Sequence, residues 1–272
     1  MVNILQQKMR PPWAVALERA QREFKELQPI EEDTLAELAA WLLIEHVYQD
    51  LRLDGIKLAR KRITDLLMRS GLPETPEEAL AVSYSEAVQR LSRIVSSAAG
   101  DADSAPVELT IDRLLELHRI ALGEIDEMAG QFRVTNINPL YPRHEPAGPF
   151  ELPRLVEVAL EWFSAQSILE LHPVEQAALV HLRLYDLQPF GKASGRLTRL
   201  AASLFTLRAD LPPIIVLADD AEAYYQALLT GFQMATQPLV ELFARSIGRT
   251  LRQMREIVKS PGTGNQELGI GN

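Results

Sequence analysis

The stretch "LQPFGKASGRLTRL", residues 187–200, holds the residues whose types and spacing could do chemistry. Arg196 and Arg199 follow a turn of small residues and lie three positions apart, the spacing of neighbours on one face of a helix. A helix that begins here directs free backbone N–H groups and the positive end of its dipole at the turn. Two cations at that end are disfavoured by the dipole unless an anion offsets them, so the pattern predicts a phosphate site. Pairing of both arginines with acidic side chains, or their exposure to solvent, is an equal alternative.

The other polar side chains of this turn are unsuited to acid–base or metal chemistry. Gln188 carries a neutral amide that is no usable base near neutrality, and the ammonium of Lys192 has no lone pair for a metal. Ser194 could cap the following helix. No two of the five histidines lie three or four residues apart, which weakens any metal-site interpretation. We therefore expect anion binding and no metal site, with a solvated surface role as the alternative for Lys192.

Helices on both sides must position this turn. "HPVEQAALVHLRLYDL", residues 172–187, places a proline at a first helical position and continues with apolar residues at helical spacing. "GRLTRLAASLFTLRADLPP", residues 195–213, begins a second helix, and residues 34–53, 110–125, 152–169 and 223–254 repeat the pattern. The protein is thus predicted to be mainly α.

Three segments interrupt the helical pattern. Residues 132–150, "FRVTNINPLYPRHEPAGPF", contain prolines and glycine that would break a helix, and predict an extended flap or hairpin. Residues 96–108, "SSAAGDADSAPVE", are predicted to be a polar linker before a helix capped by Thr110. The glycine-rich tail is predicted to be disordered. These segments divide the chain into an N-terminal helical part (1–107), a core (108–258) and a tail (259–272).

Composition excludes several classes of protein. The 272 residues are 47% hydrophobic and 24% charged, as in ordinary globular proteins. The net charge of -9 argues against nucleic-acid binding, and the lack of cysteine rules out disulfides and thiol nucleophiles. The start of the chain does not resemble a signal peptide, and no apolar run approaches membrane-spanning length. We expect a cytoplasmic protein that binds neither nucleic acid nor membrane.

The turn and its flanking helices resemble the Fic (Fido-domain) family, whose signature is His-Pro-Phe-x-Asp/Glu-Gly-Asn-Gly-Arg-x-x-Arg. Pro189, Phe190, Gly195, Arg196 and Arg199 match it. "AGQFRV", residues 129–134, is similar to the start of the family's flap, and "AEAYYQALLTG", residues 221–231, to a later tyrosine-containing helix. The resemblance covers roughly residues 35 to 250. It implies a mainly α Fic/Fido-type helical domain with a short β-hairpin flap and an N-terminal helical segment.

The N-terminal part resembles a subgroup of Fic proteins that carry an inhibitory helix with the pattern Ser/Thr-x-x-x-Glu-Gly/Asn. The corresponding stretch is "DLRLDG", with Asp50, Asp54 and Gly55, in a helix expected at about 35–60. In that subgroup the glutamate pairs with the second motif arginine and blocks productive ATP binding. The resemblance implies a pair between Asp54 and Arg199. The alternative is that Asp54 and Gly55 simply end a helix.

The turn departs from the family motif at the positions of its catalytic groups. Gln188 stands where the family has its histidine base, and general-base assistance contributes about a hundred- to ten-thousandfold. Lys192 stands where an acidic residue holds Mg²⁺, and its single positive charge equals the sum of carboxylate and Mg²⁺. The resemblance therefore implies that ATP or another nucleotide binds without Mg²⁺, at Lys192, Ser194, Gly195, Arg196 and Arg199.

Two functions remain open at this stage. The first is a degenerate Fic-domain protein without efficient AMP transfer, which acts by binding an unknown protein partner and could form a homodimer. The alternative is an active protein adenylyltransferase, or a related phosphoryl-group transferase, that uses a non-standard motif with Asp186 or substrate groups as base. In either case the family's flap positions the target protein, and here it comprises Arg133, Val134, Thr135, Asn136, Ile137 and Asn138.

Overall fold

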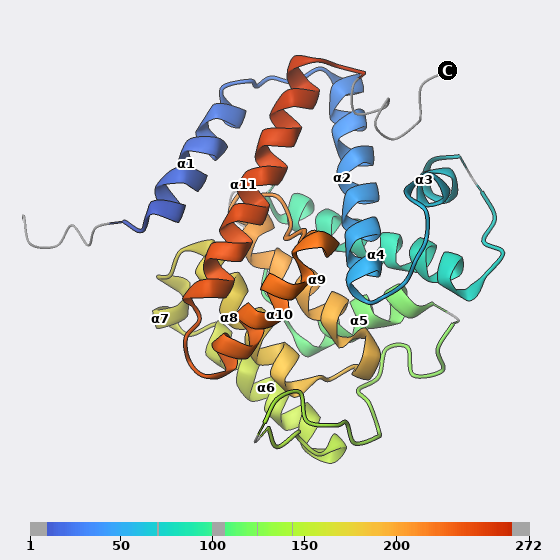
Figure 1. Ribbon diagram of the computed structural model, residues 1–272, viewed down its shortest axis with the longest axis vertical. Coiled ribbons are helices and arrows are strands. Elements are labelled where there is room, and N and C mark those ends of the chain that lie inside the picture. The colour runs from blue at the N-terminus through green and yellow to red at the C-terminus, as the bar shows by residue number, and fades with distance from the viewer. Residues whose placement is uncertain (1–9, 70, 100–106, 124, 143, 263–272) are drawn as a thin grey trace, which may run out of the picture.

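Helices form nearly all of the regular structure in the computed structural model, which describes residues 10–69, 71–99, 107–123, 125–142 and 144–262 (Figure 1). The α-helices are α1 (Pro12–Lys25), α2 (Glu32–Leu53), α3 (Arg60–Met68), α4 (Pro76–Ala99), α5 (Ile111–Leu122), α6 (Leu152–Phe163), α7 (Gln166–Leu169), α8 (Pro173–Leu187), α9 (Ser194–Leu207), α10 (Ala221–Phe232) and α11 (Gln237–Lys259). Short 3₁₀ turns lie at Pro149–Glu151, Gly191–Ala193 and Ala218–Asp220. The mainly α prediction is confirmed.

Helix α9 forms the centre of the core, packed against α8, α4 and α5. Of its 14 residues 12 are buried, so it has no solvent-facing side. A helix buried all round is normally apolar, and the leucines, alanines and Phe205 of α9 fit that rule. Arg196 and Arg199 do not, because both are buried on the same helix. Two buried cations need counter-charges, and these come from another part of the chain.

Helix α2 supplies these counter-charges at its C-terminal end. It packs against α4 and α11, and Asp54 just beyond its last turn contacts Arg196 in the first turn of α9. The buried apolar residues Ile44, Val47 and Leu51 hold the helix to the core through one face. Gly55, at a φ of 83°, reverses the chain just beyond the helix end. The helix thus ends at residue 53, earlier than the position near 60 expected from the sequence.

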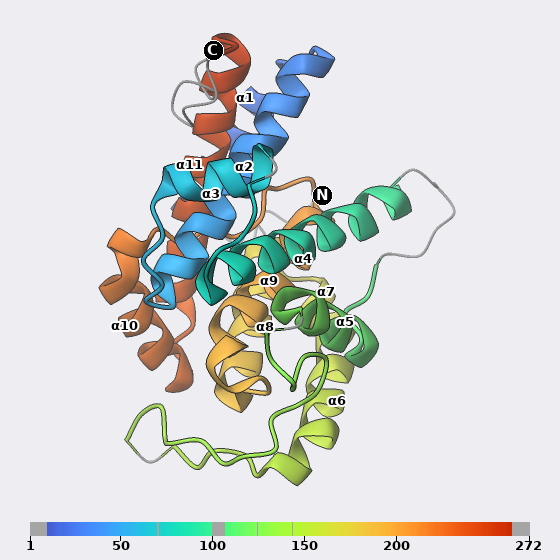
Figure 2. The same cartoon turned by 90° about the vertical axis from the view of Figure 1, so that its right-hand side faces the viewer.

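The segment between α5 and α6 contains no strand in the part that the structure describes, residues 125–142 and 144–148. The predicted β-hairpin flap is therefore wrong in its secondary structure. Figure 2 shows instead a long loop that leaves the helical body and returns to it. Pro139, Pro142 and Pro146 lack the N–H donors that a strand ladder requires, which explains why no hairpin forms.

Two other boundaries differ from the sequence prediction. Helix α4 continues to residue 99, so the first part of the expected linker at 96–108 is helical, while residues 100–106 lie outside the described structure. Thr110 does cap α5, with its Oγ1 accepting the N–H of Arg113 at 3.2 Å. The predicted disordered tail mostly falls on residues 263–272, which also lie outside the described part. No described helix is both long and apolar enough to span a membrane.

Candidate functional site

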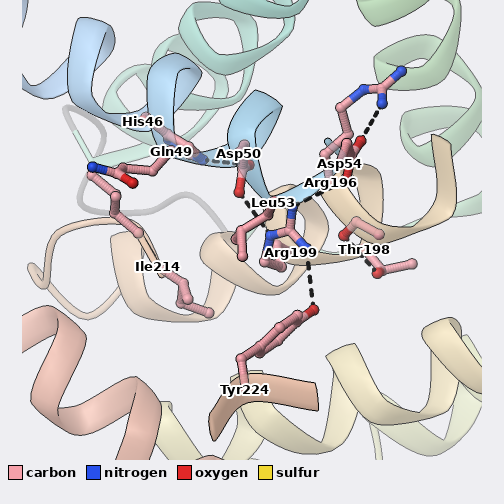
Figure 3. Close-up of polar contacts among 12 residues, drawn as sticks. His46, Gln49, Asp50, Leu53, Asp54, Arg196, Thr198, Arg199, Ile214 and Tyr224 are labelled. Atoms are coloured by element: carbon pink, nitrogen blue, oxygen red, sulfur yellow. Dashed lines mark hydrogen bonds and ion pairs between the residues drawn. The ribbon is translucent and has the colours of Figure 1, made fainter. Parts of the chain in front are cut away.

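Arg199 lies at the centre of a buried polar cluster (Figure 3). Its side chain is 1% exposed, and its Nε donates to Oδ1 of Asp50 at 2.7 Å. Its Nη1 donates to the hydroxyl of Tyr224 at 3.1 Å. Burial acts to lower the pKa of Arg199, but Asp50, Tyr224 and Asp54 outweigh it and raise the pKa well above its ordinary value. The guanidinium is therefore a permanent cation, with hydrogen-bond acceptors at Nε and Nη1.

Asp50 is the main counter-charge of this cluster. It is completely buried in the last turn of α2, where it also accepts the hydroxyl of Tyr84 and lies 3.4 Å from Nε2 of His46. Burial alone would raise the pKa of this carboxyl, yet Arg199, His46 and Tyr84 lower it below its usual range. Asp50 is thus ionised at neutral pH and is fixed on three sides.

Asp54 engages the other arginine. One of its oxygens accepts from Nη1 of Arg196, and the other lies 3.7 Å from Nη2 of Arg199. Its pKa is raised, because burial outweighs the two arginines beside it. Asp54 is also the C-cap residue of α2, followed by Gly55 in the left-handed region. Termination of the helix and pairing with an arginine, which the sequence left as alternatives, therefore occur together.

The pairing differs in detail from the one that the sequence suggested. The expected pair between Asp54 and Arg199 is present as an ion pair at 3.7 Å, but the hydrogen bond of Asp54 is with Arg196, and Asp50 accepts the hydrogen bond of Arg199. Arg196 lies in the first turn of α9 and Arg199 one turn further on, because α9 begins at residue 194. Two aspartates four residues apart on α2 thus face two arginines three residues apart on α9. Each charge has a partner in this arrangement.

The polar side chains of the turn between α8 and α9 differ in exposure and in hydrogen bonding. Gln188 ends α8 in the left-handed conformation (φ 44°), and Lys192 is exposed. Ser194 does not cap α9 as expected, because its Oγ accepts the N–H of Phe190 at 2.9 Å and so closes the turn itself. Gly195 lies beside Asp54 and Arg199, and a Cβ there would be 3.4 Å from Oδ1 of Asp54.

Asp186, the alternative base, is directed at the flap loop. It accepts the hydroxyl of Tyr141 at 3.0 Å, and its carboxylate lies 3.5 Å from His144 and from Arg183. Burial, together with this hydrogen bond, raises the pKa of Tyr141 to about 12. Through Tyr141 and His144, the carboxylate of Asp186 holds the loop against α8.

Arg133 fixes both arms of the loop to the end of α8. Its guanidinium donates to the carbonyl oxygens of Gln188 at 2.8 Å, Thr135 at 2.7 Å and Ala147 at 2.7 Å. Its backbone N–H donates to the carbonyl of Pro189 at 2.8 Å. The next predicted flap residues, Val134, Thr135, Asn136 and Asn138, are exposed, while Ile137 is half-buried. One arginine thus replaces the strand ladder that was expected here.

Replacing Arg133 by alanine should loosen the loop without unfolding the protein. The change removes three charge-assisted hydrogen bonds of about 1.5–3 kcal/mol each, so local opening should become at least tenfold more frequent. Limited proteolysis with proteinase K should show faster cleavage within residues 134–146. Arg154→Ala, which removes an exposed arginine near the start of α6, serves as the control. Equal cleavage rates in the two variants would contradict the anchoring role.

Three residues of the cluster were missed by the sequence analysis. Tyr84 and His46 hold Asp50, and Tyr224 links Arg199 to Nε2 of His181 at 2.7 Å. Burial, with Arg199 nearby, lowers the pKa of His181 to about 3, so its ring adds no second cation. In the sequence, each of these residues is only a polar or aromatic residue within an apolar helical face. Ordinary core packing explains that pattern equally well, so it does not identify the cluster.

Comparison with known proteins identifies the domain that contains the turn and the two arginines. Residues 108–206 match the sequence profile of the Fic/DOC family. The protein adenylyltransferase Fic of Drosophila erecta is 34% identical over 146 residues, which are 53% of this chain and 29% of that protein. The homologue of Drosophila grimshawi is also 34% identical, over 53% of this chain and 30% of its own. The chain thus matches about a third of the length of these relatives.

Solved structures agree on the fold. A Fic-domain signaling protein from Bacteroides thetaiotaomicron superimposes with a TM-score of 0.77 at 20% identity, over 90% of this chain and 98% of its own. Fic-1 (residues 134–508) from Caenorhabditis elegans gives a TM-score of 0.75 at 22% identity, over 89% of this chain and 70% of its own. Residues 108–206 thus form a Fic/DOC domain, and the fold of the chain is that of these Fic-domain structures.

Proposed function

We propose that this protein is a Fic-domain protein whose phosphate-binding arginines are held by its own helix α2, and which transfers AMP inefficiently or not at all. Nucleotide binds when Asp50 and Asp54 are displaced, and the protein acts through a protein partner. The observation that carries this proposal is the double pairing of Arg196 with Asp54 and of Arg199 with Asp50 in the interior. Carboxylates occupy there the arginine donors that phosphate oxygens would use.

Spare donors at the same place support anion binding. In the described part of the chain, Nε of Arg196 and Nη2 of Arg199 are buried without a hydrogen-bond acceptor. Both belong to residues at the N-terminal end of α9, where the helix dipole favours negative charge. A polyanion placed there would satisfy donors that Asp50 and Asp54 leave free.

The composition of the turn argues for weak transfer. Gln188 cannot accept a proton from an attacking hydroxyl near neutrality, and Asp186 is engaged by the flap loop. Mg²⁺ does not fit the turn, because Lys192 offers an ammonium where the family motif offers a carboxylate. Among the described residues, no group of three or more acidic or histidine side chains could hold a metal. We propose that Lys192, exposed in the turn four residues before Arg196, supplies the charge that a metal would bring to a phosphate.

Transfer of AMP from ATP, as in a protein adenylyltransferase, is the second candidate function. Its support is the name of the Drosophila relatives, which match 53% of this chain, and the Fic/DOC profile, which spans the turn. An active enzyme would have to take its base from the substrate or from a side chain outside the turn. The exposed loop residues Val134 (68% exposed) and Phe150 (98% exposed) are the apolar surface that we propose for a target or partner in either case.

Label transfer from α-³²P-ATP separates the two functions. The unmodified protein and Gln188→His should label neither themselves nor a lysate, because one substitution restores the base but neither the metal ligand nor access. Gln188→His with Lys192→Asp, Ser194→Asn and Asp54→Asn should recover transfer in the presence of Mg²⁺. The same combination without Gln188→His is the control, and should be about a hundred- to ten-thousandfold slower. Strong labelling by the unmodified protein would establish the second function instead.

A further inference from the structure

A cavity of about 710 Å³ lies at the far end of α9 from the arginine pair. It opens between the C-terminal end of α4, the start of α8 and the residues that follow α9. Phe163, Phe205, Leu169 and Val107 give it an apolar lining. Small-molecule sites in proteins usually measure 300–1,000 Å³ and combine an apolar lining with a few polar groups. The cavity therefore has the size and lining of a ligand site.

Arg208 is the cationic group in the wall of this cavity. Its guanidinium lies 4.3 Å from the centre of the Phe205 ring, and its Nη2 donates to Oε1 of Gln176 at 2.7 Å. No carboxylate of the described residues lies within the 4.0 Å ion-pair distance of this guanidinium. Burial lowers the pKa of Arg208, partly offset by Glu108. A partly buried cation without a direct counter-charge is costly, and an anion would relieve that cost.

The guanidinium is also held in a fixed position. Gln176 is 5% exposed, and its Nε2 donates to the carbonyls of Leu169 at 3.2 Å and Leu171 at 2.8 Å. The amide can therefore present only its oxygen to Arg208. Contact with the Phe205 ring fixes the guanidinium plane, and no acceptor within the described chain is recorded for its Nε or Nη1. These donors are preorganised for a planar anion, which reduces the entropic cost of binding.

We propose that this cavity binds a small amphipathic monocarboxylate, with the carboxylate on Arg208 and the apolar part between the aromatic and aliphatic side chains. Glu108 and Asp210 also line the cavity, and Asp210 pairs with Lys25 at 3.1 Å. These two carboxylates disfavour a dianion such as phosphate. The site is separate from the proposed nucleotide site, because twelve residues of helical rise place Arg208 about 18 Å from Arg196.

A rival explanation of Arg208 is purely structural. It follows the last residue of α9, where a cation is stabilised by the helix dipole. That role accounts for the charge but predicts no ligand selectivity. The two explanations therefore differ in whether an anionic probe binds more tightly than its uncharged analogue.

Calorimetric titration of the 272-residue chain with decanoate and with decanol tests the site. Decanoate should bind, and decanol should bind at least tenfold more weakly, since hydrogen bonds to charged groups contribute about 1.5–3 kcal/mol each. Arg208→Gln should abolish that preference, whereas Arg245→Gln, which removes an exposed arginine of α11, should not. Equal affinity for decanoate and decanol in the unmodified protein, or no binding of either, would overturn the proposal.

Two further variants keep the test decisive. Ser164→Trp adds a large side chain at an exposed position of the cavity wall, and should block decanoate while leaving the thermal midpoint unchanged. Residues 100–106 carry Asp101 and Asp103 and connect two parts of the wall in sequence. If decanoate binds only after both are changed to asparagine, the chain supplies its own anion and the proposal of a free site is wrong.

Discussion

Replacing Asp50 and Asp54 together by asparagine is expected to raise the affinity for ATP by about a hundredfold or more. Each aspartate accepts a hydrogen bond from one arginine, and each arginine can donate charge-assisted hydrogen bonds of about 1.5–3 kcal/mol to a phosphate. Asparagine keeps the size of the side chain but removes the negative charge that competes with the nucleotide. Either single substitution should free one arginine and raise the affinity about ten- to a hundredfold.

Isothermal titration with ATP, with and without Mg²⁺, measures this effect. Affinities should be the same in both conditions, because Lys192 rather than a metal is proposed to meet the phosphates. Asp219→Asn removes a carboxylate that pairs with Arg52 at the surface, at 3.0 Å, and is the matched control. ATP should also raise the thermal midpoint of the double variant. At an ATP concentration of a hundred times Kd, binding to the folded state adds about 2.7 kcal/mol to the free energy of unfolding. An unchanged ATP affinity in the double variant would refute the proposal that Asp50 and Asp54 of α2 block the arginines.

The sequence predicted the helices because their apolar spacing is a local property. The periodic segments at 34–53, 110–125 and 172–187 correspond to α2, α5 and α8, whereas 152–169 is divided between α6 and α7. Thr110 and Pro173 mark helix starts as expected. The prediction of a β-hairpin flap was wrong because it treated the prolines only as residues that break a helix. The same prolines also remove donors from a strand ladder, and one buried arginine takes over its role.

The site was predictable only in part. Small residues followed by Arg196 and Arg199 indicated anion chemistry at a helix start, and "DLRLDG" indicated carboxylates that could meet them. Which aspartate meets which arginine depends on how two helices cross, and periodicity does not specify that. Tyr84 and the cavity at Arg208 depend on contacts between segments far apart in the chain, so neither leaves a local pattern.

Removing one partner of the buried ion pair between Arg199 and Asp50 should strongly destabilise the fold. Arg199→Ala leaves the completely buried carboxylate of Asp50 without its main counter-charge, and should cost roughly 3–5 kcal/mol of unfolding free energy at pH 7. Arg52→Ala breaks an exposed pair and should cost less than about 1 kcal/mol. Urea unfolding followed by circular dichroism measures both. Arg199→Ala combined with Asp50→Asn should recover part of the loss, because no buried charge then remains unpaired.

The pH dependence of this loss distinguishes charge from packing. In the unmodified protein the pKa of Asp50 lies below its unfolded value of about 3.9, so the pair stabilises the fold above that pH and the contribution fades below it. Without Arg199, burial is the largest remaining cause and should raise the pKa of Asp50 above the unfolded value. The variant then gains stability, relative to the unmodified protein, as the pH falls and Asp50 takes up a proton. The difference in unfolding free energy should therefore shrink from pH 7 to pH 4, whereas an equal difference at both values would assign the loss to the missing side-chain volume.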